Sequence, residues 1–310
     1  MTEKKIKMAS IGFDFICILF LIFVCYLAMP VTSNRVIYLP KGGVSEIITY
    51  LQEKNFEVCK FDGLFVRMFG YPQSGWIDIK ATHLSRGDFL YRLTKAKAAI
   101  KTITLIPGET MYFFAQDIAK EFDLSATKIL EAYKKYAKYE DGVILADTYH
   151  IPMGITEENL VLYLLNHSLE RHKALSIKIL GEYDEVQWFK YIIIASIIQK
   201  ESANIPEMPL VSAVIHNRLK KKMPLQMDGS LNYGQYSHTP ITAKRIRNDS
   251  TLYNTYRHKG IPHNPIGSVG FDAIKAAISP ADVDYLFFVK NPQGTHTFTR
   301  TYNEHLKNIH

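Results

Sequence analysis

One long apolar segment near the N-terminus restricts the possible folds more than any other feature. Residues 8–29 contain a single charge, Asp14, and are rich in Ile, Leu, Phe and Val. About 20 such residues suffice to cross the hydrocarbon layer of a bilayer. Lys4, Lys5 and Lys7 precede the run, and positive charge beside a span favours the cytoplasmic side. The sequence therefore predicts a single-pass anchor in the inner (cytoplasmic) membrane, with the N-terminus in the cytoplasm and the remainder in the periplasm.

A cleavable signal peptide is the alternative explanation of the same segment. The run is long for the apolar part of a signal peptide, and Tyr26–Pro30 at its end lacks a clear small-x-small cleavage site. A retained anchor is therefore the interpretation that we carry forward.

The rest of the chain has the composition of a folded protein with an anionic partner. Its 310 residues, 47% of them hydrophobic, can form two or three modest domains with cores of their own. The net charge of +7 suits nucleic acid, a membrane surface or an acidic polymer. No arginine-rich tract or zinc-finger spacing is present, which argues against nucleic acid. Cys59 is the single cysteine outside the apolar run and no His-x-x-x-His or His-Glu-x-x-His spacing occurs, so we expect no metal.

A strand followed by a turn and a helix is predicted twice after the anchor. Residues 36–39 predict a strand and residues 44–54 a helix. Later, residues 101–106 alternate like a strand, Gly108-Glu109-Thr110 forms a turn, and two helices follow. This second unit, about residues 101–135, resembles the LysM module, a peptidoglycan-binding unit with the order strand, Gly-Asp/Glu-Thr, helix, loop, helix. Any other small mixed unit is the alternative.

Local signals also predict element boundaries in this region. Ser45 is the expected N-cap of the helix at 44–54. Residues 143–152 predict a strand. Thr156, followed by two glutamates, begins a helix that we expect to end near His167.

The longest apolar run outside the anchor ends in a carboxylate. Residues 188–203 are apolar almost all round, which is typical of a buried helix. Glu201 stands at the C-terminal end, where burial and the negative end of the helix dipole both disfavour the charged carboxylate. A carboxyl group that stays protonated near working pH can act as a general acid. Position alone leaves the alternative of a solvated glutamate at a helix end.

Ordered motifs from this helix to the C-terminus resemble the endolytic transglycosylases of the YceG-like family, also called MltG. The helix ends in Gln199-Lys200-Glu201-Ser202, where the family has Glu-Lys-Glu-Thr. The family's catalytic glutamate therefore falls on Glu201, and its first glutamate is Gln199 here. The family's later Asn-Pro-Gly is also changed, to Ser268-Val269-Gly270. The stretches that match in order are Asn217-Arg218-Leu219, 225–228, 233–234, 253–256, 260–266, 276–280, 285–289, 294–298 and Glu304-His305.

The resemblance implies a lytic transglycosylase, a carbon–oxygen lyase that cleaves peptidoglycan within its glycan strands without water. Glu201 would protonate the glycosidic oxygen that leaves N-acetylmuramic acid (MurNAc). It would then accept the proton of that sugar's C6 hydroxyl, which closes a 1,6-anhydro ring. The nucleophile is intramolecular, so proximity replaces a positioned water, and no cofactor or metal is required. The candidate substrate-binding residues are Ser202, Gln226, Asp228, Tyr233, Tyr253, Asn254, Tyr256 and His296.

Some of these residues have a structural alternative. Aromatic packing in the core competes with sugar stacking for Tyr233 and Tyr253. We interpret Asn217 and Arg218 as structural, through hydrogen bonds at a helix end and an ion pair.

Together these observations predict an α+β protein in three parts. A cytoplasmic stub and transmembrane anchor occupy residues 1–32, and a membrane-proximal α/β region with the LysM-like module occupies 33–178. A mixed α/β catalytic domain follows at 179–310, in which residues 285–289 and 295–299 form paired strands. The expected partners are peptidoglycan glycan strands, the inner membrane through the anchor and, by the resemblance, the synthases that make nascent strands.

Two other functions stay open from the sequence. A muramidase-type hydrolase would add water and would use Glu201 and Asp228 as its two carboxyl groups. A non-catalytic scaffold of the cell-wall synthesis machinery would bind glycan and leave it intact.

Overall fold

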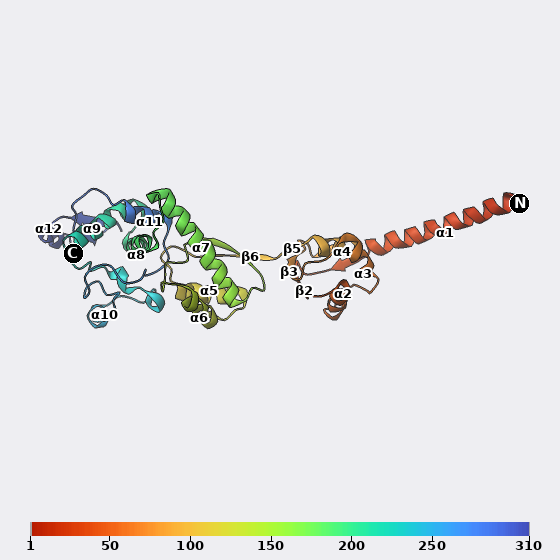
Figure 1. Ribbon diagram of the computed structural model, residues 1–310, viewed down its shortest axis with the longest axis horizontal. Helices are drawn as coiled ribbons and strands as arrows, with labels where there is room; N and C mark the ends of the chain where they lie inside the picture. Colours follow the sequence, from red (N-terminus) through yellow and green to blue (C-terminus); the bar gives the residue numbers. More distant parts are fainter. Residues whose placement is uncertain (1, 310) are drawn as a thin grey trace. The chain divides into compact units, whose positions relative to one another are not determined.

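In a computed structural model, the chain forms two compact units (Figure 1). Unit 1 comprises residues 1–101 and 151–154, and unit 2 comprises 102–150 and 155–310. The structure describes residues 2–309, with the backbone alone for residues 2–7 and 9. The side chains of Lys4, Lys5 and Lys7, on which the predicted cytoplasmic N-terminus depends, lie outside this description.

The N-terminal apolar run is a single helix. The helix α1 (Thr2–Ala28) contains the segment Ser10–Ala28, whose mean hydropathy is 2.6 and whose side chains are not buried in the protein. Within residues 2–309 it is the one helix that is long and apolar enough to cross a membrane. The predicted apolar helix is therefore confirmed as a helix, and its length of about 28 Å, at 1.5 Å per residue over the 19 residues of the segment, suits a bilayer.

Unit 1 continues with short strands and three helices around one core. The strand β1 (Pro30–Thr32) pairs antiparallel with β4 (His83–Ser85). The strand β2 (Val36–Leu39) pairs antiparallel with β3 (Gly75–Asp78), which also pairs with β5 (Lys97–Ala98). The helices are α2 (Val44–Glu53), α3 (Asp62–Phe69) and α4 (Arg86–Lys95). The core that β2 and the three helices form together contains Ile37, Leu39, Ile48, Leu51, Phe65, Val66, Phe89 and Leu90.

Unit 2 begins with the same order of elements. The strand β6 (Ile100–Thr104) is followed by α5 (Met111–Phe122) and α6 (Ala126–Tyr136), and β7 (Thr148–Pro152) returns to pair with β6. The order strand, helix, helix, strand also describes β2, α2, α3 and β3 of unit 1. The predicted strand at 101–106 and the two helices after it are confirmed, within a few residues at their ends.

The remainder of unit 2 is built around one central helix. The helices α7 (Glu157–Leu180), α8 (Glu185–Glu201), α9 (Met208–Lys220) and α11 (Phe271–Ile278) form most of it, and α8 packs against both α9 and α11 (Figure 1). The antiparallel hairpin of β8 (Phe287–Lys290) and β9 (His296–Thr299) confirms the predicted strand pair. The shorter elements are η1 (Ile205–Glu207), η2 (Asp228–Leu231), η3 (Gly234–Tyr236), α10 (Ala243–Asn248) and α12 (Tyr302–Lys307).

Apolar residues on all sides hold α8 in the interior of unit 2. Trp188, Ile192, Ala195, Ile197 and Ile198 are completely buried. One polar contact fixes its first turns, because the indole N–H of Trp188 donates to Nδ1 of His172 on α7 at 3.0 Å. Burial lowers the pKa of His172 to about 4, so this ring is neutral and its Nε2–H donates to the carbonyl of Val143 at 3.0 Å. The mixed α+β character and the buried helix are therefore as predicted.

Three predicted boundaries are wrong. The helix α2 is capped by Gly43 and begins at Val44, so Ser45 lies inside its first turn. Of the strand predicted at 143–152, only 148–152 is a strand. Residues 143–145 are buried, but Leu145 N–H donates to Ser168 Oγ at 3.2 Å and not to a neighbouring strand, so this segment is an internal loop.

The helix α7 continues 13 residues past the predicted end at His167, to Leu180. Its buried face changes from leucine to Ser168, His172 and Ser176, which keep the helical spacing and are each hydrogen bonded. An apolar pattern does not detect such a face. The helix ends at Gly181, whose φ of +84° is the left-handed conformation that glycine adopts readily.

Gly142 is the glycine of unit 2 whose replacement should cost most, because it combines a left-handed backbone (φ +73°) with close packing. A Cβ there would lie 2.6 Å from Cβ of Pro265. We expect Gly142→Ala to lower the free energy of unfolding by about 1–2 kcal/mol because of the left-handed backbone. Overpacking against Pro265 should lower it by roughly 1–3 kcal/mol more. Hydrogen exchange of the α8 amides in the full-length protein in detergent measures the loss.

The matched control is Gly181→Ala. Gly181 has φ +84°, and a Cβ added there would meet no atom within 4 Å, so only the backbone cost applies. Equal losses for the two variants would contradict the packing described for Gly142.

Candidate active site

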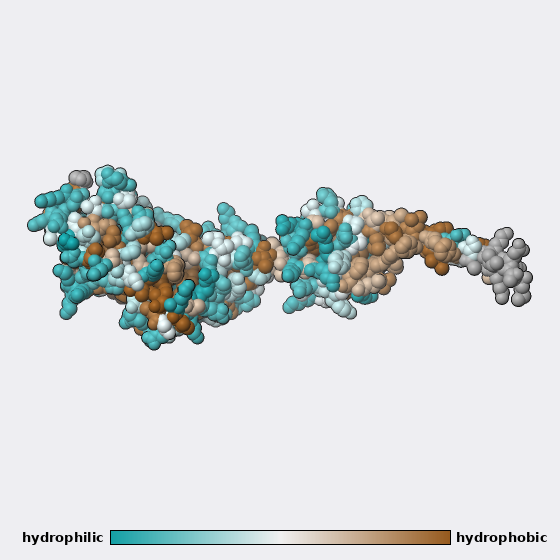
Figure 2. All heavy atoms as spheres, turned by 90° about the horizontal axis from the view of Figure 1, so that it is seen from above, coloured by the Kyte–Doolittle hydropathy of each residue, from teal (hydrophilic) through white to brown (hydrophobic). Residues whose placement is uncertain are grey.

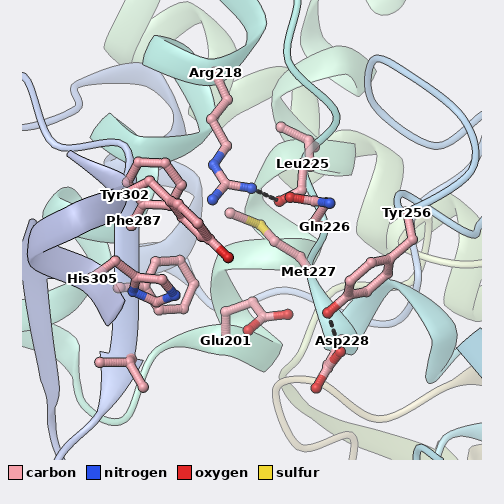
Figure 3. A pocket seen from close by; sticks show the side chains of 12 residues that line it. Glu201, Arg218, Leu225, Gln226, Met227, Asp228, Tyr256, Phe287, Tyr302 and His305 are labelled. Carbon is pink, nitrogen blue, oxygen red and sulfur yellow. Dashed lines mark hydrogen bonds between the residues drawn. The ribbon is translucent and has the colours of Figure 1, made fainter. Parts of the chain in front are cut away.

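Glu201 is the last residue of α8 and lies in a pocket of about 350 Å³ (Figure 3). The side chain is partly exposed, and its exposed side faces this pocket. Burial of the rest raises the pKa of the Glu201 carboxyl from its ordinary 4.5 to about 7, and the nearby Asp228 carboxylate raises it further. A group with this pKa is present in both protonation states near neutral pH, so it can give and take a proton.

A close backbone contact fixes one oxygen of this carboxyl group. The N–H of Gly229 donates to Oε1 of Glu201 at 2.6 Å. A Cβ on residue 229 would lie 2.9 Å from the same oxygen and 3.0 Å from Cβ of Lys200, so only glycine permits this approach. Oε2 of Glu201 forms no hydrogen bond with any of the residues from 2 to 309. The second oxygen is therefore available to a ligand.

The neighbouring Lys200 ties the loop that carries Gly229 to α8. Its ammonium donates to Oγ of Ser237 at 2.8 Å and to the carbonyl of Asn232. Burial lowers the pKa of Lys200 to about 8. Gln199, at the position where a glutamate was expected from the family motif, accepts a hydrogen bond from Gly270 N–H at 3.2 Å, at the start of α11. Both residues before Glu201 thus hold the surrounding backbone in place.

Asp228 and Tyr256 form a hydrogen-bonded pair on one side of the pocket (Figure 3). The Tyr256 hydroxyl donates to Oδ1 of Asp228 at 2.6 Å. Burial and the adjacent carboxylate raise the pKa of Tyr256 above its ordinary 10, so the hydroxyl stays protonated. Gln226 also lines the pocket and has a left-handed backbone with φ +50°. Such conformations are uncommon outside glycine and gather at functional sites.

The opposite wall is aromatic and comes from the C-terminal hairpin and α12 (Figure 3). The ring of Phe287 on β8 stacks on His305 at 5.3 Å and lies 5.8 Å from Tyr302. Burial and the Arg218 charge lower the pKa of His305 below its ordinary 6.5, so this ring is neutral at neutral pH. The wall therefore offers apolar faces with polar edges, a surface that suits a sugar ring.

Arg218 also lines the pocket, and its contacts are to main-chain carbonyls. Its guanidinium donates to the carbonyls of Leu286 and Leu225, each at 2.6 Å, and lies over the ring of Phe287 at 5.1 Å. Asn217 similarly donates to the carbonyls of Val283 and Tyr285 at 2.8 and 3.0 Å. These bonds join α9 to β8 and to the loop before Gln226, as expected for a structural role, but Arg218 forms no ion pair within the described chain.

Four of the predicted site residues lie together, and five do not line the pocket. Glu201, Gln226, Asp228 and Tyr256 line it. Ser202 follows Glu201 directly, with its Oγ buried and without a partner among the described residues. The other four, which are not part of the pocket lining, are Tyr233, Tyr253, Asn254 and His296.

Three of these residues brace the loop before Tyr256. The rings of Tyr233 and Tyr253 stack at 4.1 Å, and their hydroxyls donate to Asp249 and Glu140. The buried Asn254 donates to the carbonyls of Ile246 and Asp249. These contacts are those of packing residues, and they set the position from which the Tyr256 side chain reaches Asp228.

His296 does not line the pocket; it contacts an acid and packs edge to face against the pocket-lining Phe288 at 5.2 Å. Its Nδ1 lies 2.8 Å from Oε2 of Glu207, and its backbone N–H donates to Oε1 of Glu207 at 2.8 Å. Glu207 also accepts from Ala203 N–H, two residues after Glu201, at 3.2 Å. His296 and Glu207 together link β9 to the segment that follows the catalytic candidate.

Sequence reasoning missed the aromatic wall. Phe287 and His305 were part of matching stretches and Tyr302 was not, and nothing in the spacing of the three indicated that they face Glu201. The hairpin brings them there, and its position depends on long-range contacts such as those of Arg218.

Comparison with known proteins places the whole chain after the anchor in one family. The model of the YceG-like family matches residues 37–310. An endolytic murein transglycosylase of Bacillus subtilis (strain 168) is 27% identical over 306 residues, which cover 87% of this chain and 82% of that protein. A protein of the same name from Streptococcus pneumoniae (strain ATCC BAA-255 / R6) is 24% identical, and the aligned region covers 91% of this chain but 59% of the pneumococcal protein.

A solved structure supports the fold. The crystal structure of a YceG-like protein from Listeria monocytogenes superposes with a TM-score of 0.57, covers 89% of this chain and 99% of that one, and is 22% identical. Because the family model spans 37–310, with Glu201 and its pocket inside it, the chain belongs to the YceG-like family.

Proposed function

We propose that this protein is an endolytic lytic transglycosylase that cleaves the MurNAc–GlcNAc bond of peptidoglycan glycan strands without water. The observation that carries the proposal is the position of Glu201, a carboxyl group with a pKa of about 7 in a pocket. The relatives from Bacillus and Streptococcus are named endolytic murein transglycosylases, which supports the reaction class.

One carboxyl group is sufficient for this reaction. Protonated Glu201 donates its proton from Oε2 to the glycosidic oxygen as the bond to C1 of MurNAc breaks. The C6 hydroxyl of the same sugar then attacks C1, and the Glu201 carboxylate accepts its proton. The products are a 1,6-anhydro-MurNAc end and a free hydroxyl on the released strand, so Glu201 returns to its starting state. The Gly229 N–H holds Oε1 while Oε2 exchanges the proton.

The other pocket residues are assigned supporting roles in this proposal. Asp228, oriented by Tyr256, stabilises positive charge that develops at C1. Gln226 offers an amide to the acetamido groups, and the wall of Phe287, Tyr302 and His305 packs against a sugar face. Residues outside the lining support the pocket through their contacts with protein groups; they are Ser202, Tyr233, Tyr253, Asn254 and His296.

The proposal extends to the organisation of the chain. We propose three parts: an anchor at 1–32, a membrane-proximal region at 33–178 and a catalytic domain at 179–310. The unit β6-α5-α6 is assigned as the LysM-like module that holds glycan, because its order of strand, helix and helix is that of the motif. Through α1 the enzyme would stay at the inner (cytoplasmic) membrane with its active site in the periplasm, on nascent strands and near their synthases.

Product analysis of wild type and Glu201→Gln tests the reaction. We expect wild type to leave 1,6-anhydro-MurNAc ends on purified strands, and Glu201→Gln to lose on the order of 10³-fold or more in rate, since a missing general acid alone costs 10²–10⁴-fold. Mass spectrometry distinguishes these ends from the reducing ends that a hydrolase leaves.

The matched control is Glu185→Gln, at the other end of α8, where the carboxylate pairs with Lys138 on the surface. This variant should keep wild-type activity. Reducing ends from wild type would favour the muramidase that uses Asp228 as its second carboxyl group. Intact strands from wild type and both variants would favour the scaffold.

Gly229→Ala tests the backbone contact to Glu201. The new methyl group would displace Oε1, and we expect kcat to fall by about 10- to 100-fold, as small misplacements of reacting groups do. Gly234→Ala is the control, because a Cβ there meets no atom within 4 Å although φ is +47°. Similar kcat values for the two variants would show that the Gly229 contact does not position the acid.

The pH dependence follows from the raised pKa of Glu201. The first step needs the protonated acid, so kcat/KM should be level below pH 7 and fall about tenfold per pH unit above it. The profile is measured at 25 °C with the full-length enzyme and purified strands. A fall that begins near pH 4.5, the ordinary value for glutamate, would contradict the role of burial.

A further inference from the structure

The helix α3 presents an apolar face to solvent beside the end of the candidate membrane span. Phe61, Leu64, Met68 and Tyr71 are 53%, 50%, 77% and 79% exposed. Their spacing of three, four and three residues places the first three on one side of the helix and Tyr71 just past its end at Phe69. The opposite side of α3 is buried in the core of unit 1, where Val66 is fully covered. Large exposed apolar patches of this kind mark interaction surfaces.

Aromatic contacts make this face continuous with α1. The ring of Phe23 on α1 lies 5.4 Å from Phe65 on α3, and Tyr26 lies 6.0 Å from Phe61. Phe61 and Phe65 pack edge to face at 5.3 Å. Figure 2 shows apolar residues over α1 and over the end of unit 1 next to it. The apolar surface of the span therefore does not stop where α1 ends.

A buried ion pair between α3 and α4 holds α3 beside α1. Asp62, at the start of α3, pairs with Arg86 of α4 at 2.9 Å and is completely buried. The Tyr26 hydroxyl donates to Oδ1 of Asp62 at 2.7 Å, and the Arg86 guanidinium lies over the Tyr26 ring at 4.6 Å. These contacts all lie within unit 1, and they prevent α3 from turning away from the span.

We infer that the exposed face of α3, formed by Phe61, Leu64, Met68 and Tyr71, lies in the headgroup region of the membrane as a second lipid contact beside the span. This inference rests on the proposed membrane anchor. Tyrosine is a typical residue of the membrane–water boundary, and Tyr26 lies at the end of the span. Phe23 is one turn deeper, by about 4.5 Å, so α3, which contacts both, lies at the depth of a surface-bound helix.

Charge beside the apolar face favours lipid as its occupant. Lys60 and Arg67 are exposed next to Phe61 and Met68, and basic side chains at the membrane surface attract anionic headgroups. A second copy of this chain or another membrane protein would also cover apolar residues. Only lipid, however, is necessarily present at this depth once α1 spans the bilayer.

Site-specific fluorescence on the full-length chain tests the inference. Cys17, Cys25 and Cys59 are replaced by Ala, Ala and Ser, and the environment-sensitive dye NBD is attached at Met68→Cys in nanodiscs that contain phosphatidylglycerol. The control site is Tyr38→Cys, an exposed position on β2 at the end of unit 1 away from α1 (Figure 1). A third label, at Ile18→Cys, reports on the span itself.

We expect lipid that carries a nitroxide near the headgroup to quench the label at position 68. We also expect iodide to quench this label about threefold less than the label at position 38, as for a helix immersed at the interface. Leu64→Asp should restore iodide quenching to a label at Tyr71→Cys, and Leu64→Met should not. Iodide quenching at 68 equal to that at 38 would overturn the inference while leaving the enzyme proposal intact.

Two further outcomes would also decide the question. Protection from iodide at position 68 without quenching by the nitroxide lipid would mean that protein covers this face, and would overturn the inference. Absence of lipid quenching at position 18 would show that α1 does not span the bilayer, and would overturn the anchor and the inference together. Activity on purified strands is measured separately, so neither result is confused with a failure of the transglycosylase.

Discussion

Burial of α8 is the interaction on which the rest of the site depends. Because the helix is apolar on every side, it occupies the centre of unit 2, and its last residue is carried from the core to the floor of a pocket. The same burial that stabilises the unit raises the pKa of Glu201 to about 7. Stability and chemistry are thus coupled through one helix, since the environment that makes the carboxyl group useful exists only when α8 is fully packed.

The segments around α8 position Glu201 and form the walls of the pocket. The loop at Gly229 approaches Glu201 closely because glycine has no side chain. Lys200 of α8 holds the same loop through a hydrogen bond to Ser237. The loop at Tyr253–Tyr256 is braced by hydrogen bonds of the buried Asn254 and places the Tyr256 hydroxyl on Asp228. The C-terminal hairpin closes the other side. The pocket is therefore assembled from segments that lie far apart in the sequence, each held by its own contacts.

Local signals in the sequence were sufficient for the helices α1, α2, α5, α6, α7 and α8, and for the position of Glu201 at a helix end. The long apolar run identified α8, and Thr156 marked the start of α7 correctly. The end of α7 was predicted wrongly because its buried face there is polar, with Ser168, His172 and Ser176. The strand at 143–145 was predicted wrongly because this buried segment bonds to a side chain at Leu145 and not to a neighbouring strand.

The walls of the site could be predicted only in part. Gln226, Asp228 and Tyr256 were found through the family motifs. Tyr233 and Tyr253 make the aromatic packing contacts that were the stated alternative to sugar stacking, whereas the contacts of Asn254 and His296 with protein groups were not anticipated. A motif identifies which residues belong to a site region, but it does not say which side chains point inward. Phe287, Tyr302 and His305 depend on the docking of a hairpin, and no local pattern encodes that docking.

The proposed mechanism requires that partial burial keeps a large fraction of the Glu201 carboxyl protonated at neutral pH. A carbon-13 NMR titration of protein labelled at the side-chain carboxyl of glutamate measures this directly, with the Glu201→Gln variant to assign the signal. The account predicts one glutamate that titrates near pH 7 and is lost in the variant. A Glu201 signal that titrates at or below pH 4.5 would contradict it, because the group would then be an ordinary solvated carboxylate.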